Sequence, residues 1–389
     1  MPLIRYATGW LSGPGLGLVL AAVLAACSPP QPSGYRIPPA GGADADAEVP
    51  GNVGSGASIA TSGTIVPPLP RRFVDDGAAH SDESTLGEWL RHAWSLTFSQ
   101  FPQADRLPRH HVETPWRAAT QFVNARDAEL AITWYGHASF LLRLGDTKIL
   151  TDPVFAKRLG PGTDRLVPVL PDPQLLRWLD AIVISHADMD HFDMDTLRGL
   201  SARFPNASIH VPRGTAGLAQ RAGFARVFEH ARYGRVTLGD VSLTAVPAIH
   251  GLRRPPYRSD SMDWVGFMIE SPDTRIYFAG DTGMGDIFEP MRRHFGPVDI
   301  ALMPAGAWAP RAFQKAHHVT PEEALEISRI LDASLSIGMH WGTYPLSPEP
   351  PTEQKRRFLA AGTAQNPSTV MRIGETRVFD ARRIAMPGS

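Results

Sequence analysis

The chain has 389 residues, 43% of them hydrophobic and 20% charged, and its 38 basic and 39 acidic residues give a formal net charge of -1. This is a globular composition, and the balanced charge gives no support for nucleic acid as a partner. A single cysteine excludes an intrachain disulfide and a thiolate-rich metal site, whereas 14 histidines make imidazole and carboxylate the available metal ligands.

Residues 1–26 have the pattern of a lipoprotein signal peptide. Arg5 gives a positive start, and an apolar stretch then runs to the lone Cys27. The stretch is shorter than the roughly 20 apolar residues of a transmembrane helix. The Leu-Ala-Ala-Cys sequence resembles the lipobox of bacterial lipoproteins. This implies cleavage before Cys27 and membrane attachment through a lipid on its sulfur. Since Ser28 follows, the resemblance favours the outer membrane, facing the periplasm. The alternative is an ordinary signal peptide with a chance cysteine.

Two segments separate this signal from the main domain. Residues 27–70 are rich in Pro, Gly, Ala and Ser without periodicity, which predicts a flexible, disordered tether. Residues 71–125 are expected to form an N-terminal helical extension. Within it, residues 84–100 place apolar side chains at spacings of three to five and are expected to pack on the main domain as a helical collar.

The main domain is predicted to cover residues 126–389. Strands are expected at 130–144, 148–155, 179–185, 208–211, 264–270, 274–279, 298–303 and 334–338, with two more around 235–247. Helices are expected near 194–204, 214–222, 285–294 and 321–331. Thr320, Pro321 and Glu323 mark the start of the last helix through a capping box. Two runs of strands, each followed by helix–strand alternation, predict two sheets packed face to face with helices outside, the strand at 334–338 ending the core.

A dense polar stretch, residues 185–191, directly follows one predicted strand. In extended backbone, alternate side chains share a face, so His186, Asp188 and Asp190 can converge, and a turn would bring His191 beside them. Clustering four such groups is costly unless a cation holds them, and a divalent metal would do so. The alternative is a solvated loop.

Three further strand ends carry the same residue types. His250 follows Val246-Pro247, Asp281 lies between glycines after Phe278, and His340 follows Ile337-Gly338. Each alone is more often structural than a ligand. Their joint recurrence at strand ends predicts a metal site built from distant parts of the chain.

These residues resemble the metallo-β-lactamase superfamily, whose signature is H-x-H-x-D-H followed by a separate His, Asp and His. The nearer resemblance is to the branch of N-acyl-phosphatidylethanolamine phospholipase D and the ascorbate-6-phosphate lactonase-like hydrolases. It rests on the motifs at 136–139, 150–155, 318–324 and 340–344 and covers roughly 125–347. The resemblance implies an α/β fold, an αββα sandwich, with two metals, usually zinc, at one edge of the sheets.

The resemblance also implies a ligand set. One ion would be held by His186, His250 and the side chain at 188, the other by Asp190, His191 and His340, with Asp281 bridging. Position 188 departs from the pattern, because the family usually has histidine where this chain has Asp188. The aspartate weakens the first site or favours iron or manganese over zinc, so two ions, one ion or none are all open.

The resemblance implies three further roles. Asp190 would orient the nucleophilic water while ligating, and His318, before the capped helix, would face the substrate as a second catalytic residue. Asp152, in T-D-P, would orient a metal ligand, the alternative being a turn-forming residue. The alternative for His318 is a loop residue without chemical importance. His137 is interpreted as a buried structural histidine.

The predicted activity is hydrolysis of a phosphodiester or ester bond by a metal-activated water, phospholipase D-like, on a small-molecule or lipid-derived substrate. A lactonase and a non-catalytic envelope-binding protein are the alternatives. Aromatic side chains near the site line an apolar wall or belong to the core: Trp308, Trp341 and Tyr344. The arginines after His250 are expected either to bind a phosphate group of the substrate or to belong to a solvated basic loop: Arg253, Arg254 and Arg258.

Overall fold

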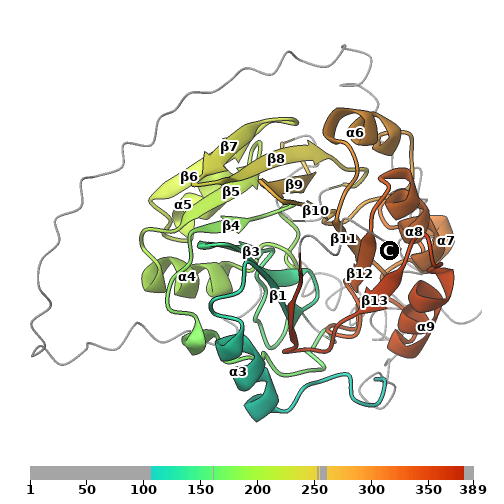
Figure 1. Ribbon diagram of the computed structural model, residues 1–389, viewed down its shortest axis with the longest axis horizontal. Coiled ribbons are helices and arrows are strands. Elements are labelled where there is room, and N and C mark those ends of the chain that lie inside the picture. Colours follow the sequence, from blue (N-terminus) through green and yellow to red (C-terminus); the bar gives the residue numbers. More distant parts are fainter. Residues whose placement is uncertain (1–106, 161, 252–253, 255–260, 381–389) are drawn as a thin grey trace, which may run out of the picture.

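The computed structural model describes residues 107–160, 162–251, 254 and 261–380 (Figure 1). The expected signal peptide, tether and helix at 84–100 lie outside these residues and stay predictions. Within the described ranges, no helix has the length and apolar character needed to cross a membrane.

Two seven-stranded sheets form the framework. The first has the order β14 (Thr376–Val378), β1 (Leu130–Gly136), β2 (Ser139–Leu144), β3 (Thr147–Thr151), β4 (Ala181–Val183), β5 (Ser208–Pro212) and β6 (Arg226–His230). The second has the order β13 (Ser368–Val370), β12 (Leu335–Met339), β11 (Ile300–Pro304), β10 (Thr274–Phe278), β9 (Val265–Ser271), β8 (Val241–Pro247) and β7 (Arg235–Leu238). In each sheet an antiparallel run passes into a parallel run.

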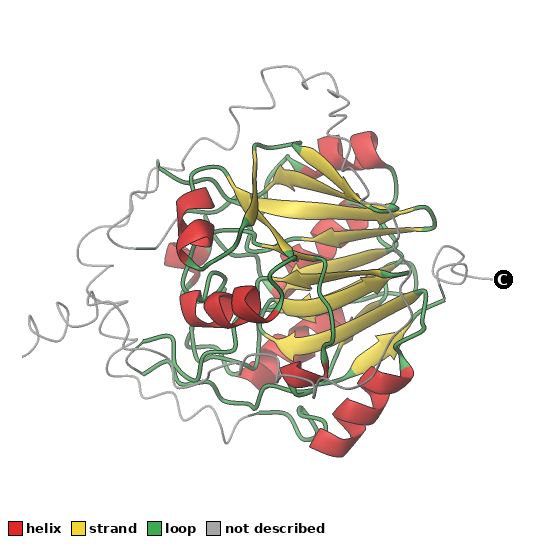
Figure 2. Ribbon diagram, turned by 90° about the vertical axis from the view of Figure 1, so that its left-hand side faces the viewer, coloured by secondary structure: helices red, strands yellow, loops and turns green. Residues whose placement is uncertain are grey.

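Helices cover the outer faces of the two sheets (Figures 1 and 2). On the side of the first sheet lie α3 (Pro115–Asn124), α4 (Met194–Arg203), α5 (Ala216–Arg221) and the short 3-10 turn η3 (Pro173–Leu175). On the side of the second sheet lie α6 (Phe288–Phe295), α7 (Arg311–Gln314), α8 (Pro321–Ile330) and α9 (Pro351–Ala361). The expected αββα sandwich is confirmed.

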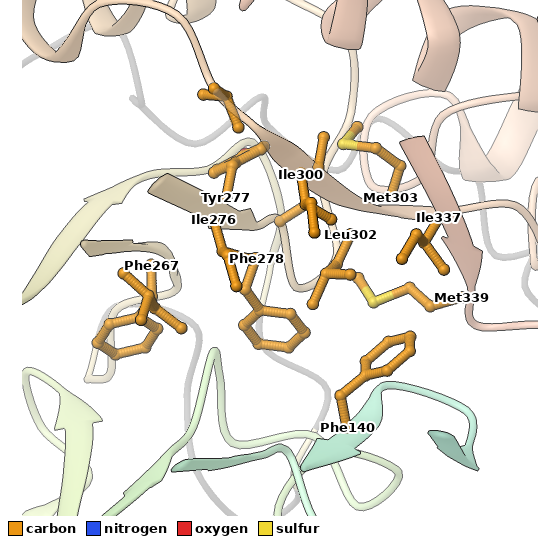
Figure 3. Packing of buried hydrophobic residues seen from close by; sticks show 14 of the residues in the cluster. Phe140, Phe267, Ile276, Tyr277, Phe278, Ile300, Leu302, Met303, Ile337 and Met339 are labelled. Atoms are coloured by element: carbon orange, nitrogen blue, oxygen red, sulfur yellow. The ribbon is translucent and has the colours of Figure 1, made fainter. Parts of the chain in front are cut away.

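The main core lies between the sheets. Figure 3 shows Phe140 of the first sheet pointing towards Phe278 and Met339 of the second. All three side chains are fully buried. Each such side chain stabilises the fold by about 1.5–3 kcal/mol relative to exposure, so the two sheets hold their strand ends in a fixed relation. That fixed relation is what allows separate loops to build one site.

Three sequence predictions of structure are wrong. The strand expected at 148–155 ends at Thr151, because β3 passes into a loop there. The expected strand at 130–144 is two strands, β1 and β2, because the chain bends at His137-Ala138. The core also does not end at 334–338, since α9, β13 and β14 follow. The last of these pairs with β1, Val378 opposite Ala131. Three-residue strands are too short to show an alternating pattern, which is why β13 and β14 escaped prediction. The capping box of α8 is confirmed.

Candidate metal centre

The polar stretch 185–191 links β4 to α4 at the carboxyl edge of the first sheet. Its backbone turns where the His191 N–H donates to the Asp188 carbonyl over 3.0 Å. This turn brings the His191 ring beside that of His186, with 4.1 Å between ring centroids. The local geometry agrees with the expectation from the sequence.

Two triads of donor atoms result. In the first, Asp188 Oδ2 lies 3.7 Å from His186 Nε2 and 3.7 Å from His250 Nε2. Three donor atoms at this spacing fit around one ion, and all three side chains are buried. His250 arrives from the loop that follows β8, in the other sheet.

In the second triad, Asp190 Oδ2 lies 3.6 Å from His191 Nε2 and 3.6 Å from His340 Nε2. Asp281 stands between the triads. Its Oδ2 is 3.1 Å from the same two imidazole nitrogens and 3.9 Å from His186 Nε2. The structure therefore brings together all seven side chains that the sequence proposes as ligands.

The donors fit a metal because their inward nitrogens lack other partners. Among the described residues, no hydrogen bond reaches the buried Nε2 atoms of His186, His191, His250 and His340. Three of these rings are held from behind, since each Nδ1–H donates: His186 to Ser185 Oγ, His191 to Asp152 Oδ2, and His250 to the His317 carbonyl. Buried polar atoms are costly without partners, and bound cations would satisfy these four.

Asp152 orients two of the imidazoles. Its fully buried carboxylate accepts the His191 Nδ1–H at 2.7 Å and the Ser185 Oγ–H at 2.5 Å. Because that hydroxyl donates to Asp152, its oxygen is free to accept from His186 Nδ1 at 2.8 Å. Ser185 is thus a site residue that sequence reasoning missed, although its place directly before His186 was a usable indication.

Close approach of two loops depends on one glycine. Gly280 has φ +58, and a Cβ built on it would lie 2.4 Å from Ser185 Cβ. No larger residue fits there without a shift of the backbone. The glycine therefore sets Asp281 against the 185–191 loop.

The crowded charges shift the ionisation of the centre. Burial lowers the pKa of His340, but Asp281 and Asp190 outweigh it and raise that pKa to about 9. Burial also lowers the pKa of His191, but the carboxylates of Asp281 and Asp190 outweigh burial and raise that pKa above its usual value. Imidazoles that keep protons between carboxylates are places where divalent cations can replace those protons.

His318 lies beside the donors. Its Nδ1 is 3.8 Å from Asp281 Oδ2, and its ring is 5.3 Å from that of His250. Arg311 holds the loop by donating to the His318 carbonyl and pairing with Glu323 of the capped helix. The structure thus places His318 at the centre, beside Asp281 and His250.

His137 also lies at the centre, which the interpretation as a structural histidine missed. Its Nε2 is 3.1 Å from Asp190 Oδ2, and its ring centroid is 4.0 Å from that of His340. Its pKa is lowered to about 3, by burial first and by His340 second, so the ring is neutral.

Strained backbone gathers around the same place. His137, Asp152 and His340 have φ values of 53, 31 and 59. Residues other than glycine adopt such values at a cost, and they persist where the surroundings enforce them. This concentration agrees with a functional site.

The aromatic residues and arginines have supporting places. Trp341 is 2% exposed and stacks on Trp134 at 5.7 Å, so it belongs to the core. Tyr344 is also buried and donates to the Ala156 carbonyl. Arg254 donates to backbone carbonyls of the 185–191 loop and of Phe192, which braces that loop. Trp308 lies half-buried, and Arg253 and Arg258 fall outside the described residues.

Comparison with known proteins agrees with this architecture. The model of the beta-lactamase superfamily domain matches residues 147–341, half of the chain. An N-acyl-phosphatidylethanolamine-hydrolyzing phospholipase D of Caenorhabditis elegans is 33% identical over 244 residues, which is 57% of this chain and 66% of that protein. A metal-dependent hydrolase of Pyrobaculum aerophilum is 27% identical over 63% of this chain and 100% of its own length.

A solved structure shares the fold. The metallo hydrolase Igni18 of Ignicoccus hospitalis has a TM-score of 0.50 and 22% identity, covering 64% of this chain and 98% of that one. The two-sheet fold and the cluster of histidine and aspartate donors together identify this protein as a metal-dependent hydrolase. The chain belongs to the metallo-β-lactamase superfamily.

Proposed function

We propose that this protein hydrolyses a phosphodiester or ester bond with a metal-activated water, as a phospholipase D-like enzyme. The observation that carries the proposal is the convergence of seven donor side chains with four inward nitrogens that lack hydrogen-bond partners among the described residues. Four imidazoles and three carboxylates make a donor set for divalent ions.

When bound, divalent ions at such a centre lower the pKa of water towards neutrality and stabilise charge that develops on oxygen. Asp190 is the most exposed of the three carboxylates, with 21% of its side chain exposed against 11% for Asp188 and 2% for Asp281. It can therefore accept a hydrogen bond from the attacking water and orient it. His318, beside Asp281, contacts the substrate. Asp152 keeps His191 in place through its hydrogen bond.

The arrangement supports two ions. His186, Asp188 and His250 would hold one, Asp190, His191 and His340 the other, and Asp281 would bridge them. Zinc is usual in the family, and iron or manganese is the alternative that Asp188 favours, because it replaces an imidazole by a harder oxygen donor.

A lipid-derived phosphodiester is the leading substrate class. It rests on the 33% identity to the worm enzyme, an N-acyl-phosphatidylethanolamine-hydrolyzing phospholipase D. A lactone is the second candidate, from the ascorbate-6-phosphate lactonase-like motifs. A non-catalytic envelope-binding protein is the third, and Asp188 is the feature that favours it.

The test begins with elemental analysis of the purified protein. Turnover is then compared on phosphodiesters, lactones and β-lactams for the wild type and for His340→Ala and Asp281→Asn. We expect two ions per chain and hydrolysis of a phosphodiester that both variants abolish. If the metal-loaded protein turned over none of these substrates, the enzymatic proposal would fail and the non-catalytic binding protein would be the remaining candidate.

We further propose that the protein is a lipoprotein attached to the membrane through a lipid on Cys27. The lipobox-like Leu-Ala-Ala-Cys supports this. Metabolic labelling with a fatty acid tests it: the wild type should take up label, and Cys27→Ser should not.

A further inference from the structure

His137 occupies a costly position in the bend between β1 and β2. Gly136 and His137 both have positive φ, +108 and +53, and the register of the two strands shifts between Trp134 and Gly136. A bulge of this kind redirects a side chain. Glycine or asparagine would make the bend at lower cost, so the turn alone does not account for an imidazole here.

The backbone of His137 is fixed to the loop that carries His340. Its N–H donates to Thr343 Oγ1 at 2.7 Å, and its carbonyl accepts from the His340 N–H at 3.1 Å. The same carbonyl accepts from Trp134 Nε1 at 3.0 Å. These bonds involve no side-chain atom of His137, so a substitution of the ring leaves them available.

The ring makes a separate contact. Because a carboxylate accepts hydrogen bonds, the 3.1 Å contact with Asp190 Oδ2 is donated by His137 Nε2–H. This is the same oxygen that lies 3.6 Å from the Nε2 atoms of His191 and His340. Among the three carboxylates of the centre, Asp190 is also the one least enclosed by protein.

We propose that His137 is a positioning residue, whose Nε2–H holds Asp190 Oδ2 in the orientation that serves both the second ion and the attacking water. The inference rests on the proposed function and adds a residue to it. Hydrogen-bond partners of metal-binding side chains typically change metal affinity by about 10- to 100-fold when removed.

Two variants separate this role from a structural one. His137→Asn tolerates positive φ, but its amide is too short to reach Asp190. His137→Gln carries a donor with nearly the reach of Nε2, at some backbone cost. His110, exposed and with φ 59, supplies the matched control His110→Asn, a substitution of the same type outside the centre.

Each protein is purified, its metal removed, and its affinity for zinc and for cobalt measured by titration, with the absorption spectrum of bound cobalt as a report on ligand geometry. We expect His137→Asn to bind the second ion, at Asp190, at least about tenfold more weakly and to alter the cobalt spectrum. Its affinity for the first ion, at Asp188, should be unchanged. Turnover should fall through kcat rather than KM. His137→Gln should recover part of each loss, and His110→Asn should match the wild type.

The inference would be overturned if His137→Asn bound both ions with wild-type affinity. It would also be overturned if His137→Gln bound the second ion no more tightly than His137→Asn while the two variants had equal melting temperatures. If the wild type binds two ions but turns over no substrate, the proposed reaction fails while the metal titration still decides the role of His137. If the wild type binds no ion, both proposals fail.

Discussion

Asp188 and Asp190 occupy equivalent places in the two halves of the centre. Asp188 Oδ2 is 3.7 Å from two imidazole nitrogens, and Asp190 Oδ2 is 3.6 Å from two others. With Asp281 shared, each half offers two nitrogens and two oxygens. The aspartate at position 188, where the family usually has histidine, therefore makes the two halves chemically alike.

This equivalence predicts the behaviour of Asp188→His. The variant should still bind two ions, and its first half should prefer zinc over manganese more strongly than the wild type does, because imidazole is the softer donor. Elemental analysis after loading with equal zinc and manganese measures both quantities. A wild type holding one ion, with a second gained in the variant, would show instead that Asp188 weakens the first half.

Metal affinity should depend on pH. Since the pKa of His340 in the metal-free protein is raised from 6.5 to about 9, an incoming ion displaces a proton at neutral pH. Affinity should therefore rise with pH through about 9 and level off above it, where the ring has lost its proton. Calorimetry in buffers of different ionisation enthalpy should detect proton release at pH 7. Metal binding at pH 7 without release of a proton would contradict the raised pKa of His340.

The same shift has the opposite effect on the metal-free fold. A group whose folded pKa exceeds its unfolded value stabilises the protein below the unfolded pKa, here 6.5, and loses that contribution as the pH rises through about 9. Metal-free protein should unfold at lower urea concentration at pH 9.5 than at pH 6.5, and His340→Phe should reduce the difference.

Asp152 and Ser185 should have separable effects. Asp152→Asn removes an ionised acceptor from His191 and from Ser185, so affinity for both ions should fall by about 10- to 100-fold. Ser185→Ala removes only the partner of His186, so the first ion alone should weaken. Titration with zinc distinguishes the two patterns. Equal weakening of both ions in Ser185→Ala would contradict the assignment.

A second buried histidine pair lies outside the centre. His210 Nδ1 is 3.0 Å from His230 Nε2, and Ser208 Oγ accepts from the other ring nitrogen of His210. Burial lowers the pKa of both rings from 6.5. The unfolded chain then binds more protons, so stability should fall as the pH drops below 6.5. His210→Phe should flatten this fall in urea unfolding, while exposed His294→Gln should not.

Local patterns predicted most of the framework and the donor positions. Donors such as His186, His250 and Asp281 stand at strand ends in short motifs, and the carboxyl edges of packed sheets meet. His137 could not be assigned in this way. Its contact with Asp190 depends on the bulge in β1 and on two positive φ values, which no residue pattern near it specifies.

The contribution of Ser185 was hidden for a related reason. A serine after a strand has many local uses, and its bridge between Asp152 and His186 exists only because three loops meet. Strand β14 escaped because a three-residue segment gains its conformation from a partner far away in the chain. In both cases tertiary contacts outweigh local preference.

The pairing of β14 with β1 also bears on biosynthesis. Strand β1 (Leu130–Gly136) is buried along its whole length, yet its outer hydrogen-bonding edge stays open until Thr376–Val378 has been translated. A nascent or truncated chain that stops before this segment would present an uncapped apolar strand, a template for intermolecular association. The first sheet can therefore close along this edge only once Thr376–Val378 has been translated and has paired with β1.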